Sequence, residues 1–436
     1  MVKLLTVLSL IFALFTLATL PWVAPVLYTT FSILQPQYVW FWVFDGSIPV
    51  FKILAGLTLL SWLIQASQKN IDYSVYKLPI NKALFALTFF VNLSNWVASY
   101  NGGWGAEFVL EVFNTLMLLY FACSALITNE QGIKYLAFGF ILTAVYYGYD
   151  ANDAYFSNDW SRFPAGRLTG PPKGAYDDNN KFAVILVIGF PFLLLGFFHF
   201  KKILIKSLMI LGMVWVLHGI FLTGSRGALL AIGAAVFVTT RVIDLAGFKK
   251  TFVNLAILAG FIFVVLDQAG GTLSRSQEVV SNNAQAQPTN PRILSWQVGL
   301  KLIANHPVFG VGVNNFRIAS AIEFPGESPH VAHNTFITFA VNNGLIAGLL
   351  YLYTFWACYV MLRKINKITP KDSISKYAAN SAFAALGGFF VAALFADMVI
   401  FEPYYFLIML ITVCYFQCTK SFDNASPKNM ENTKNV

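Results

Sequence analysis

Arg226 is a candidate for binding an anion at a membrane boundary. It lies in the segment TGSRG between two apolar segments, and Ser225 is the expected N-cap of the second one. An unpaired arginine just inside hydrocarbon costs about 2.5–3.5 kcal/mol, so an anion should meet it. The guanidinium, the free N–H groups of a helix N-terminus and the helix dipole together favour phosphate. The alternative is an arginine that extends to lipid phosphates.

His333 is a candidate general base. It stands where a long polar loop enters the apolar segment HNTFITFAVNNGLIAGLLYL. A histidine at a wet membrane face can accept a proton from a hydroxyl near neutral pH, which contributes about 10²–10⁴ to a rate. A capping or hydrogen-bonded histidine is the alternative. His330 raises the question of a metal pair, but loop spacing of this kind is not typical of zinc, and we predict no metal.

The segment NPRILSWQVGLKLIANHP predicts a helix that carries a second candidate arginine. Asn290 is the expected N-cap, Pro291 occupies the first helical position, and His306-Pro307 ends the helix. Arg292 and Trp296 are four residues apart and share a side, where Gly299 leaves room for a ligand or another helix. The residues expected on the apolar face are Ile293, Trp296, Leu300 and Ile303.

The segment RLTGPPKGAYDDNNKFA mixes cations with acids and amides. Arg167, Lys173 and Lys181 alternate with two aspartates and two asparagines, so the segment could grip a sugar or a phosphate. Equally, its charges could pair with one another in a solvated loop. Acids also stand at predicted outer helix ends and should pair with basic groups, although the sequence does not assign the pairs: Glu107, Glu111, Asp397 and Glu402.

The composition shows which kind of scaffold must position these residues. Of the 436 residues, 57% are hydrophobic and only 11% are charged, against about 25% charged in soluble domains. The net charge of +9 is not accompanied by a basic stripe with stacking aromatics, so nucleic acid is not an expected partner. The four cysteines lie in or beside apolar segments, and we expect no structural disulfide. The chain should therefore be an all-α, polytopic membrane protein.

Twelve apolar windows are long enough to be read as transmembrane helices. They lie near residues 4–28, 50–66, 83–100, 107–128, 135–150, 182–200, 203–222, 227–246, 251–267, 334–362, 377–400 and 404–418. The first window lacks a cleavage pattern before Pro21-Trp22 and is interpreted as an uncleaved span. We predict a helical bundle over residues 1–420 and a disordered cytoplasmic tail over 421–436.

The basic residues predict how the bundle is oriented. With the N-terminus in the cytoplasm, 19 of the 29 lysines and arginines fall on the inner side, as the positive-inside rule requires. Both termini should then be cytoplasmic. The long loops near 151–181 and 268–332 face outward together with TGSRG, so the candidate residues share one membrane face.

Three segments resemble the bacterial O-antigen ligase and polymerase family of polytopic, periplasm-facing glycosyltransferases. LTGSRGALLA is similar to the family's Ser-Arg-Gly motif, and NPRILSWQVGLKLIANHPVFGVGVNNF to its loop helix and Gly-x-Gly run. HNTFITFAVNNGLIAG resembles its His-Asn motif. RLTGPPKGAYDDNNKFA is a weaker match in which Asn179-Asn180 replaces Pro-Asn. Ala347 stands where ligases often have glycine, threonine or tyrosine. The likeness therefore points to the family as a whole more than to its ligase members.

The resemblance implies an inner-membrane enzyme with its active site at the periplasmic face. It would transfer a glycan from undecaprenyl pyrophosphate to a lipid A-core sugar hydroxyl, with inversion and without metal or cofactor. Arg226 and Arg292 would bind the pyrophosphate, and His333 would be the general base. The residues expected to contact substrate are Arg167, Lys173, Trp296, Asn334 and His330.

Three other functions remain open at the level of sequence. An O-antigen polymerase would use the growing glycan as acceptor, and a protein O-oligosaccharyltransferase would use a serine or threonine of a secreted protein such as a pilin. A transporter or flippase also fits twelve spans. Transporters, however, usually show two similar halves with midplane charges, whereas the polar residues here concentrate in outer loops.

Overall fold

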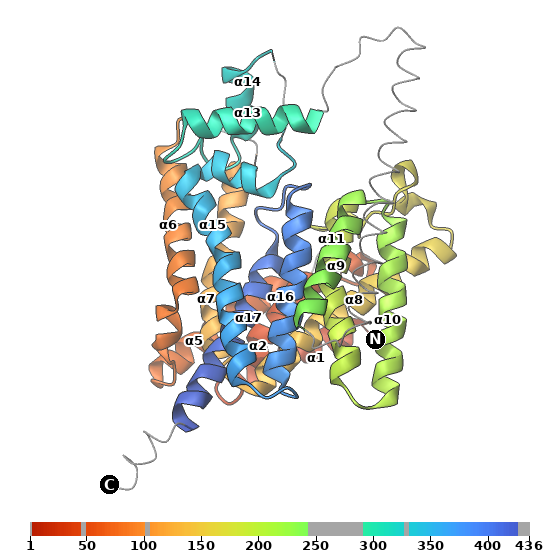
Figure 1. The fold of residues 1–436 in the computed structure, drawn as a ribbon. Helices are drawn as coiled ribbons and strands as arrows, with labels where there is room; N and C mark the ends of the chain where they lie inside the picture. Colours follow the sequence, from red (N-terminus) through yellow and green to blue (C-terminus); the bar gives the residue numbers. More distant parts are fainter. Residues whose placement is uncertain (1, 45–48, 101–104, 243–290, 327–330, 426–436) are drawn as a thin grey trace.

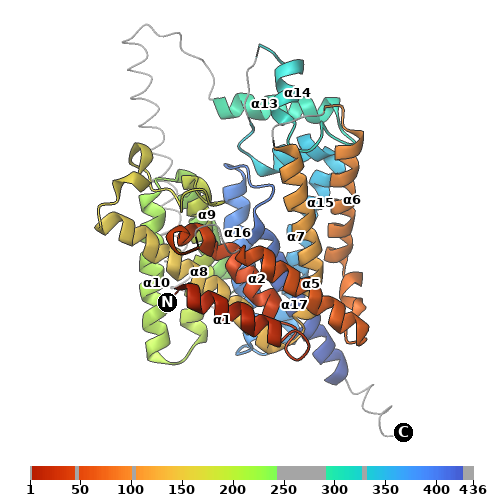
Figure 2. The same ribbon diagram turned by 180° about the vertical axis from the view of Figure 1, so that it is seen from behind.

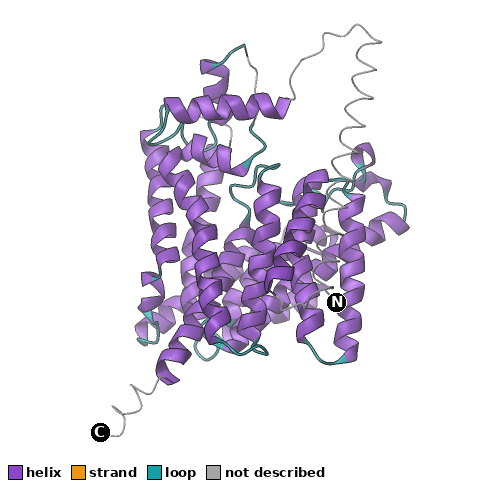
Figure 3. Cartoon of the chain, viewed as in Figure 1, coloured by secondary structure: helices purple, strands orange, loops and turns teal. Residues whose placement is uncertain are grey.

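The computed structural model describes residues 2–44, 49–100, 105–242, 291–326 and 331–425. Within these ranges the chain forms helices and loops and contains no strand (Figure 3). The helices are α1 (Val2–Phe15), α2 (Val23–Leu34), α3 (Pro36–Val39), α4 (Phe41–Phe44), α5 (Val50–Ser67), α6 (Pro79–Val97), α7 (Ala106–Leu126), α8 (Glu130–Phe156), α9 (Asn179–His199), α10 (Ile203–Leu222), α11 (Arg226–Val242), α13 (Pro291–Asn305), α14 (Phe316–Glu323), α15 (Thr335–Ile368), α16 (Ile374–Ala393) and α17 (Glu402–Ala425). The prediction of an all-α fold is confirmed.

Six of the described helices are long and apolar enough to cross a membrane, which supports a multi-pass membrane protein. They are α5, α7, α9, α10, α15 and α17. The predicted total of twelve spans is not established: α6, α8, α11 and α16, at four of the predicted windows, are not among the six, and the window 251–267 lies outside the described residues. The window 4–28 holds two helices, α1 and α2, which a turn ending near Pro21 separates. At the other end of the chain, α17 continues past residue 420 to Ala425.

Small residues let the central helices approach closely. At Gly388 of α16, an added Cβ would lie 2.8 Å from Val187 of α9 and 3.0 Å from Ala235 of α11. At Gly189 of α9, it would lie 2.2 Å from the Cβ of Ala144 in α8. Helix association in lipid depends on this kind of tight packing, since apolar lipid supplies no hydrophobic driving force between helices. The bundle thus holds α8, α9, α11 and α16 in fixed positions.

Helix α15 is broken near its N-terminal end at Gly344, whose φ of +85° and ψ of 164° lie outside the helical region. The segment 307–312 fills the break. Leu345 N–H donates to the carbonyl of Pro307 at 2.8 Å, and Val311 N–H donates to that of Val341 at 2.9 Å. Exposed backbone groups at membrane depth cost several kcal/mol each. The Gly-x-Gly segment therefore supplies hydrogen bonds that the helix loses at its break.

Helix α13 lies across one end of the bundle with α14 above it (Figures 1 and 2). We call this end the outer end and the opposite one the inner end. The face of α13 buried against the bundle differs in part from the expected one. Trp296 and Ile303 pack against a buried cluster as expected, but Ile293 and Leu300 are exposed, and Val298 and Leu302 are fully buried instead. At Gly299, an added Cβ would lie only 2.4 Å from Ile337 of α15. The room that Gly299 leaves is taken by another helix.

Candidate functional site

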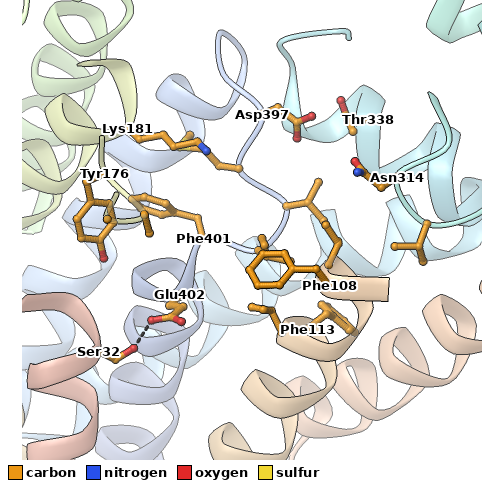
Figure 4. A pocket seen from close by; sticks show the side chains of 18 of the residues that line it. Ser32, Phe108, Phe113, Tyr176, Lys181, Asn314, Thr338, Asp397, Phe401 and Glu402 are labelled. Carbon is orange, nitrogen blue, oxygen red and sulfur yellow. Dashed lines mark hydrogen bonds between the residues drawn. The ribbon is translucent and has the colours of Figure 1, made fainter. Parts of the chain in front are cut away.

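A cavity of about 570 Å³ lies near the outer end, among the ends of several helices. Its walls come from α2, α7, α9, α15 and from the loop between α16 and α17 (Figure 4). Lys173, Lys181, Asp397, Asn314 and Asn342 contribute polar groups to the lining. A concave site that combines aromatic walls with a few polar groups is typical of ligand binding. The cavity is large enough to hold a sugar or a phosphate group.

Asp397 and Lys181 bring opposite charges to this cavity from two different elements. Asp397 lies in the loop 394–401, and Lys181 in the first turn of α9; both line the cavity (Figure 4). Burial raises the pKa of Asp397 to about 6, and the charge of Lys181 opposes that rise. Asp397 therefore changes charge close to neutral pH, where it can accept a hydrogen bond or a proton from a hydroxyl.

The segment 173–176 forms one wall of the cavity and is held in place by a residue at the end of α2. The backbone N–H of Ala175 donates to Oε1 of Gln35 at 2.9 Å. Gln35 has a left-handed φ of +50° at the end of α2 and is buried. Lower in the cavity, Ser32 of α2 donates a hydrogen bond to Glu402, beside the rings of Phe113 and Phe401 (Figure 4). Lys173, a predicted substrate contact, thus stands on a fixed wall.

Arg167 joins the TGSRG turn to the start of α9. Its Nε donates to the carbonyl of Thr223 at 3.0 Å, and its Nη2 donates to Oδ1 of Asn180 at 3.3 Å. The Ser225 hydroxyl donates to the same Asn180 oxygen at 2.9 Å. Ser225 also accepts a long hydrogen bond, 3.4 Å, from the N–H of Ala228, as expected of an N-cap. The guanidinium of Arg167 holds this corner together.

Arg226 follows this corner as the first residue of α11, and its side chain is exposed. The Arg167 network fixes the turn that precedes it, so the position of Arg226 at the start of α11 is fixed as well. The N-terminal end of α11 lies on the same side of the bundle as α13 (Figure 1).

His333 is exposed and precedes α15 with a left-handed φ of +48°. Asn334 is the buried N-cap of that helix, because its Oδ1 accepts the N–H groups of Phe336 and Ile337, both at 3.1 Å. Thr335 donates to the carbonyl of Ala396 at 2.7 Å and accepts the N–H of Met398 at 3.1 Å. These two bonds fasten the histidine segment to the loop that carries Asp397.

Trp296 connects the roof helix to the same segment. Its Nε1 donates to the carbonyl of Ala332 at 2.8 Å, immediately before His333. Arg292 lies one turn earlier in α13 and is exposed. Trp296 therefore has a clear positioning role in addition to the substrate contact that the sequence predicts. His330 lies outside the described residues.

The structure places Arg226, Arg292 and His333 on elements at the outer end, but none of the three lines the 570 Å³ cavity. Lys173 does line it, whereas the other predicted contacts within the described residues hold the surrounding segments together. Sequence reasoning noted Lys181 and Asp397 without pairing them with each other. The available signal was an acid at an outer helix end and a lysine directly after the Asn179-Asn180 pair.

Comparison with known proteins adds evidence that is independent of the geometry of the site. The family model described as O-Antigen ligase matches residues 211–352 of the chain, and no curated protein matches it. The match covers about a third of the chain and supports the predicted O-antigen ligase and polymerase family. The match also supports a ligase or polymerase type of function, and the family implies lipid-linked glycans as the general class of substrate.

Proposed function

We propose that the protein is an O-antigen ligase of the bacterial inner membrane, with its active site at the periplasmic face and both termini in the cytoplasm. It takes a glycan from undecaprenyl pyrophosphate and joins it to a sugar hydroxyl of lipid A-core. One observation carries the proposal: Arg226, Arg292 and His333 all fall within the residues 211–352 that match the ligase family. All three are also exposed on elements at the outer end of the bundle.

The chemistry requires one base and several positive charges. His333 accepts the proton of the acceptor hydroxyl, and the oxygen then attacks the anomeric carbon from the face opposite the pyrophosphate. The bond from that carbon to the pyrophosphate oxygen breaks, so the anomeric configuration inverts. Arg226 and Arg292 stabilise the charge that develops on the leaving pyrophosphate. In this proposal fixed guanidinium groups perform the charge neutralisation, and no step requires a metal.

The cavity supplies a place for the sugars next to this machinery. Its aromatic rings suit the apolar faces of a pyranose, and Asp397 and Asn342 can bond to hydroxyl groups. Lys173 and Lys181 add positive charge on the side of α9. The bonds from Thr335 to the Asp397 loop link the cavity to the His333 segment, so sugars in the cavity are held close to the chain that carries the base.

The test is a glycolipid gel of envelopes from a strain that lacks the protein and carries either wild type or His333→Ala. Wild type should place long glycan on the core, whereas His333→Ala should leave the polymer on the lipid carrier. His218→Gln is the matched control, because His218 lies in α10 and bonds to Asn152 of α8. Equal membrane levels of the three proteins, measured by immunoblot, complete the comparison.

Other outcomes point to other functions. Single repeats on the core in the absence of the protein would identify a polymerase. An unchanged core profile would direct the search to protein acceptors such as pilins, or to transport. Turnover by detergent-solubilised protein, which has no compartments to transport between, separates an enzyme from a carrier.

A further inference from the structure

A second cavity, of about 880 Å³, lies at the inner end of the bundle. It is bounded by the last turns of α9 and α11, the C-terminal half of α15 and the first half of α16. The walls include apolar side chains from each of these helices: Leu195, Phe198, Val238, Val242, Leu362 and Phe383. This cavity is separate from the outer one, because the two share no lining residue.

Positive charge converges on this inner cavity. Arg241, Arg363, Lys371 and Lys376 line it, and Asp372 is the one acid among its lining residues. Arg363, Lys371 and Lys376 are close together in the chain, whereas Arg241 comes from α11, more than 100 positions earlier, and the fold brings it to the other three. Lys376 donates to the carbonyls of Asn366 and Thr369, at 3.0 and 3.3 Å, and so caps the end of α15.

Each of the two arginines that line this cavity lies over an aromatic ring. The guanidinium of Arg241 lies 4.6 Å from the ring of Phe237, and that of Arg363 lies 5.9 Å from the ring of Tyr359. Such stacking holds an arginine along an apolar wall while its N–H groups remain available to an anion. Phe198, at the edge of the same cavity, is 50% exposed.

The positive-inside rule alone does not explain this arrangement. The rule requires basic residues near the cytoplasmic surface, and Lys364 and Lys367 on the same helix α15 satisfy it without lining the cavity. An amphipathic cavity with cations at its rim and apolar walls matches a molecule with a phosphate group and acyl chains. Basic pockets between transmembrane helices at the cytoplasmic side are known to bind phosphate-bearing lipid headgroups.

We propose that the inner cavity binds the phosphate headgroup of an anionic membrane lipid, with Arg241 and Arg363 as its main contacts. The acyl chains lie along the exposed apolar side chains at the edge, including Phe198. The lipid joins α11 to α15 at the end of the bundle opposite the outer cavity. This proposal does not depend on the reaction at the outer face.

The test is native mass spectrometry of the full-length protein in detergent, titrated with phosphatidylglycerol, phosphatidylcholine or inorganic phosphate. Wild type should bind phosphatidylglycerol in preference to phosphatidylcholine. The double variant Arg241→Gln/Arg363→Gln should bind phosphatidylglycerol about tenfold or more weakly. Lys364→Gln/Lys367→Gln removes the same amount of charge from the same inner end of the bundle, and this variant should bind phosphatidylglycerol as wild type does. Arg241→Lys/Arg363→Lys keeps the charge and should retain most of the binding.

Three results would overturn the proposal. Equal binding of the two lipids by wild type would remove the headgroup preference. If Arg241→Gln/Arg363→Gln and Lys364→Gln/Lys367→Gln lost the same amount of phosphatidylglycerol binding, the effect would be one of general surface charge. Binding of inorganic phosphate that phosphatidylglycerol does not displace would assign the cavity to a free anion. If Arg241→Gln/Arg363→Gln does not fold, Arg241→Lys/Arg363→Lys and the lipid preference of wild type still decide the question.

Discussion

Two halves of the outer face are held together by different kinds of bond. Around α9 and α11, the side chains of Arg167, Asn180 and Ser225 bond to one another and to the carbonyl of Thr223. Around α15, the backbone of segment 307–312 bonds directly to the backbone of the broken helix at Gly344. The first half is a side-chain network, and the second is a joint between two stretches of main chain.

The difference determines what each half tolerates. A side-chain network can lose one partner and keep the others, so single substitutions there should have graded effects. A backbone joint leaves no space for a side chain, because an added Cβ at Gly344 would lie 2.1 Å from the carbonyl oxygen of Val308. The joint also positions the segment that begins at His333, so damage to it should spread to the site.

Gly344→Ala should have the largest effect on the folded protein. The left-handed φ of +85° and the contact with Val308 together should cost about 3 kcal/mol or more. The measurement is thermal unfolding in detergent, with the amount of protein in the membrane as a second readout. Gly56→Ala is the control, because a Cβ at Gly56 meets nothing within 4 Å. A Gly344→Ala protein as stable as wild type would show that α15 does not need its break.

Arg226→Ala and Arg292→Ala test whether the two halves act on one substrate. Each should lower glycan transfer about 10²- to 10³-fold while the protein stays in the membrane, because each removes positive charge from the developing anion. Lysine should restore activity only in part, since it lacks the planar fork. Arg317→Ala removes another exposed outer arginine, from α14, and should keep near wild-type activity. Full activity in either alanine variant removes that arginine from the mechanism.

Asp397→Asn should stabilise the protein in a pH-dependent way. The pKa of Asp397 is about 6 in the folded protein against an ordinary 3.8, so the folded state binds the proton more tightly than the unfolded chain. Ionisation of Asp397 therefore lowers the stability of the folded protein. This cost is absent below about pH 4, grows as the pH rises towards 6, and reaches on the order of 2–3 kcal/mol at most above pH 6. Melting temperatures should diverge at pH 8 and converge at pH 4. Asp177→Asn, which changes an exposed loop acid, should show no such divergence.

Acidification should loosen α14 by a smaller amount. Burial alone would raise the pKa of Glu323, but hydrogen bonds from Asn305, His306 and Tyr100 outweigh it and hold the pKa below its usual range. The stability that these bonds add is present above pH 4.5 and is lost as the pH falls through the lowered pKa. Hydrogen exchange in α14, corrected for its intrinsic pH dependence, should rise a few-fold on acidification. Glu323→Gln should remove most of that change.

The sequence by itself determined the class of protein and the residues that stand out chemically. Apolar segments near 20 residues long predict membrane helices because of the thickness of hydrocarbon, whatever the neighbours are. Arg226 and His333 are recognisable for the same local reason: such side chains are costly at a membrane boundary unless they have a role. The three family motifs that carry the resemblance are also local strings of residues.

Only the tertiary structure decided which groups meet. Asp397 could pair with several cations by sequence, and the fold brings Lys181 to its cavity from more than 200 positions away. A glycine inside an apolar segment does not predict a broken helix, since the break at Gly344 depends on the backbone of segment 307–312. Likewise, the side of α13 that faces α15 depends on the close approach of Gly299 to Ile337. The reason is the same in each case: these energies belong to contacts between distant segments, and local patterns do not contain them.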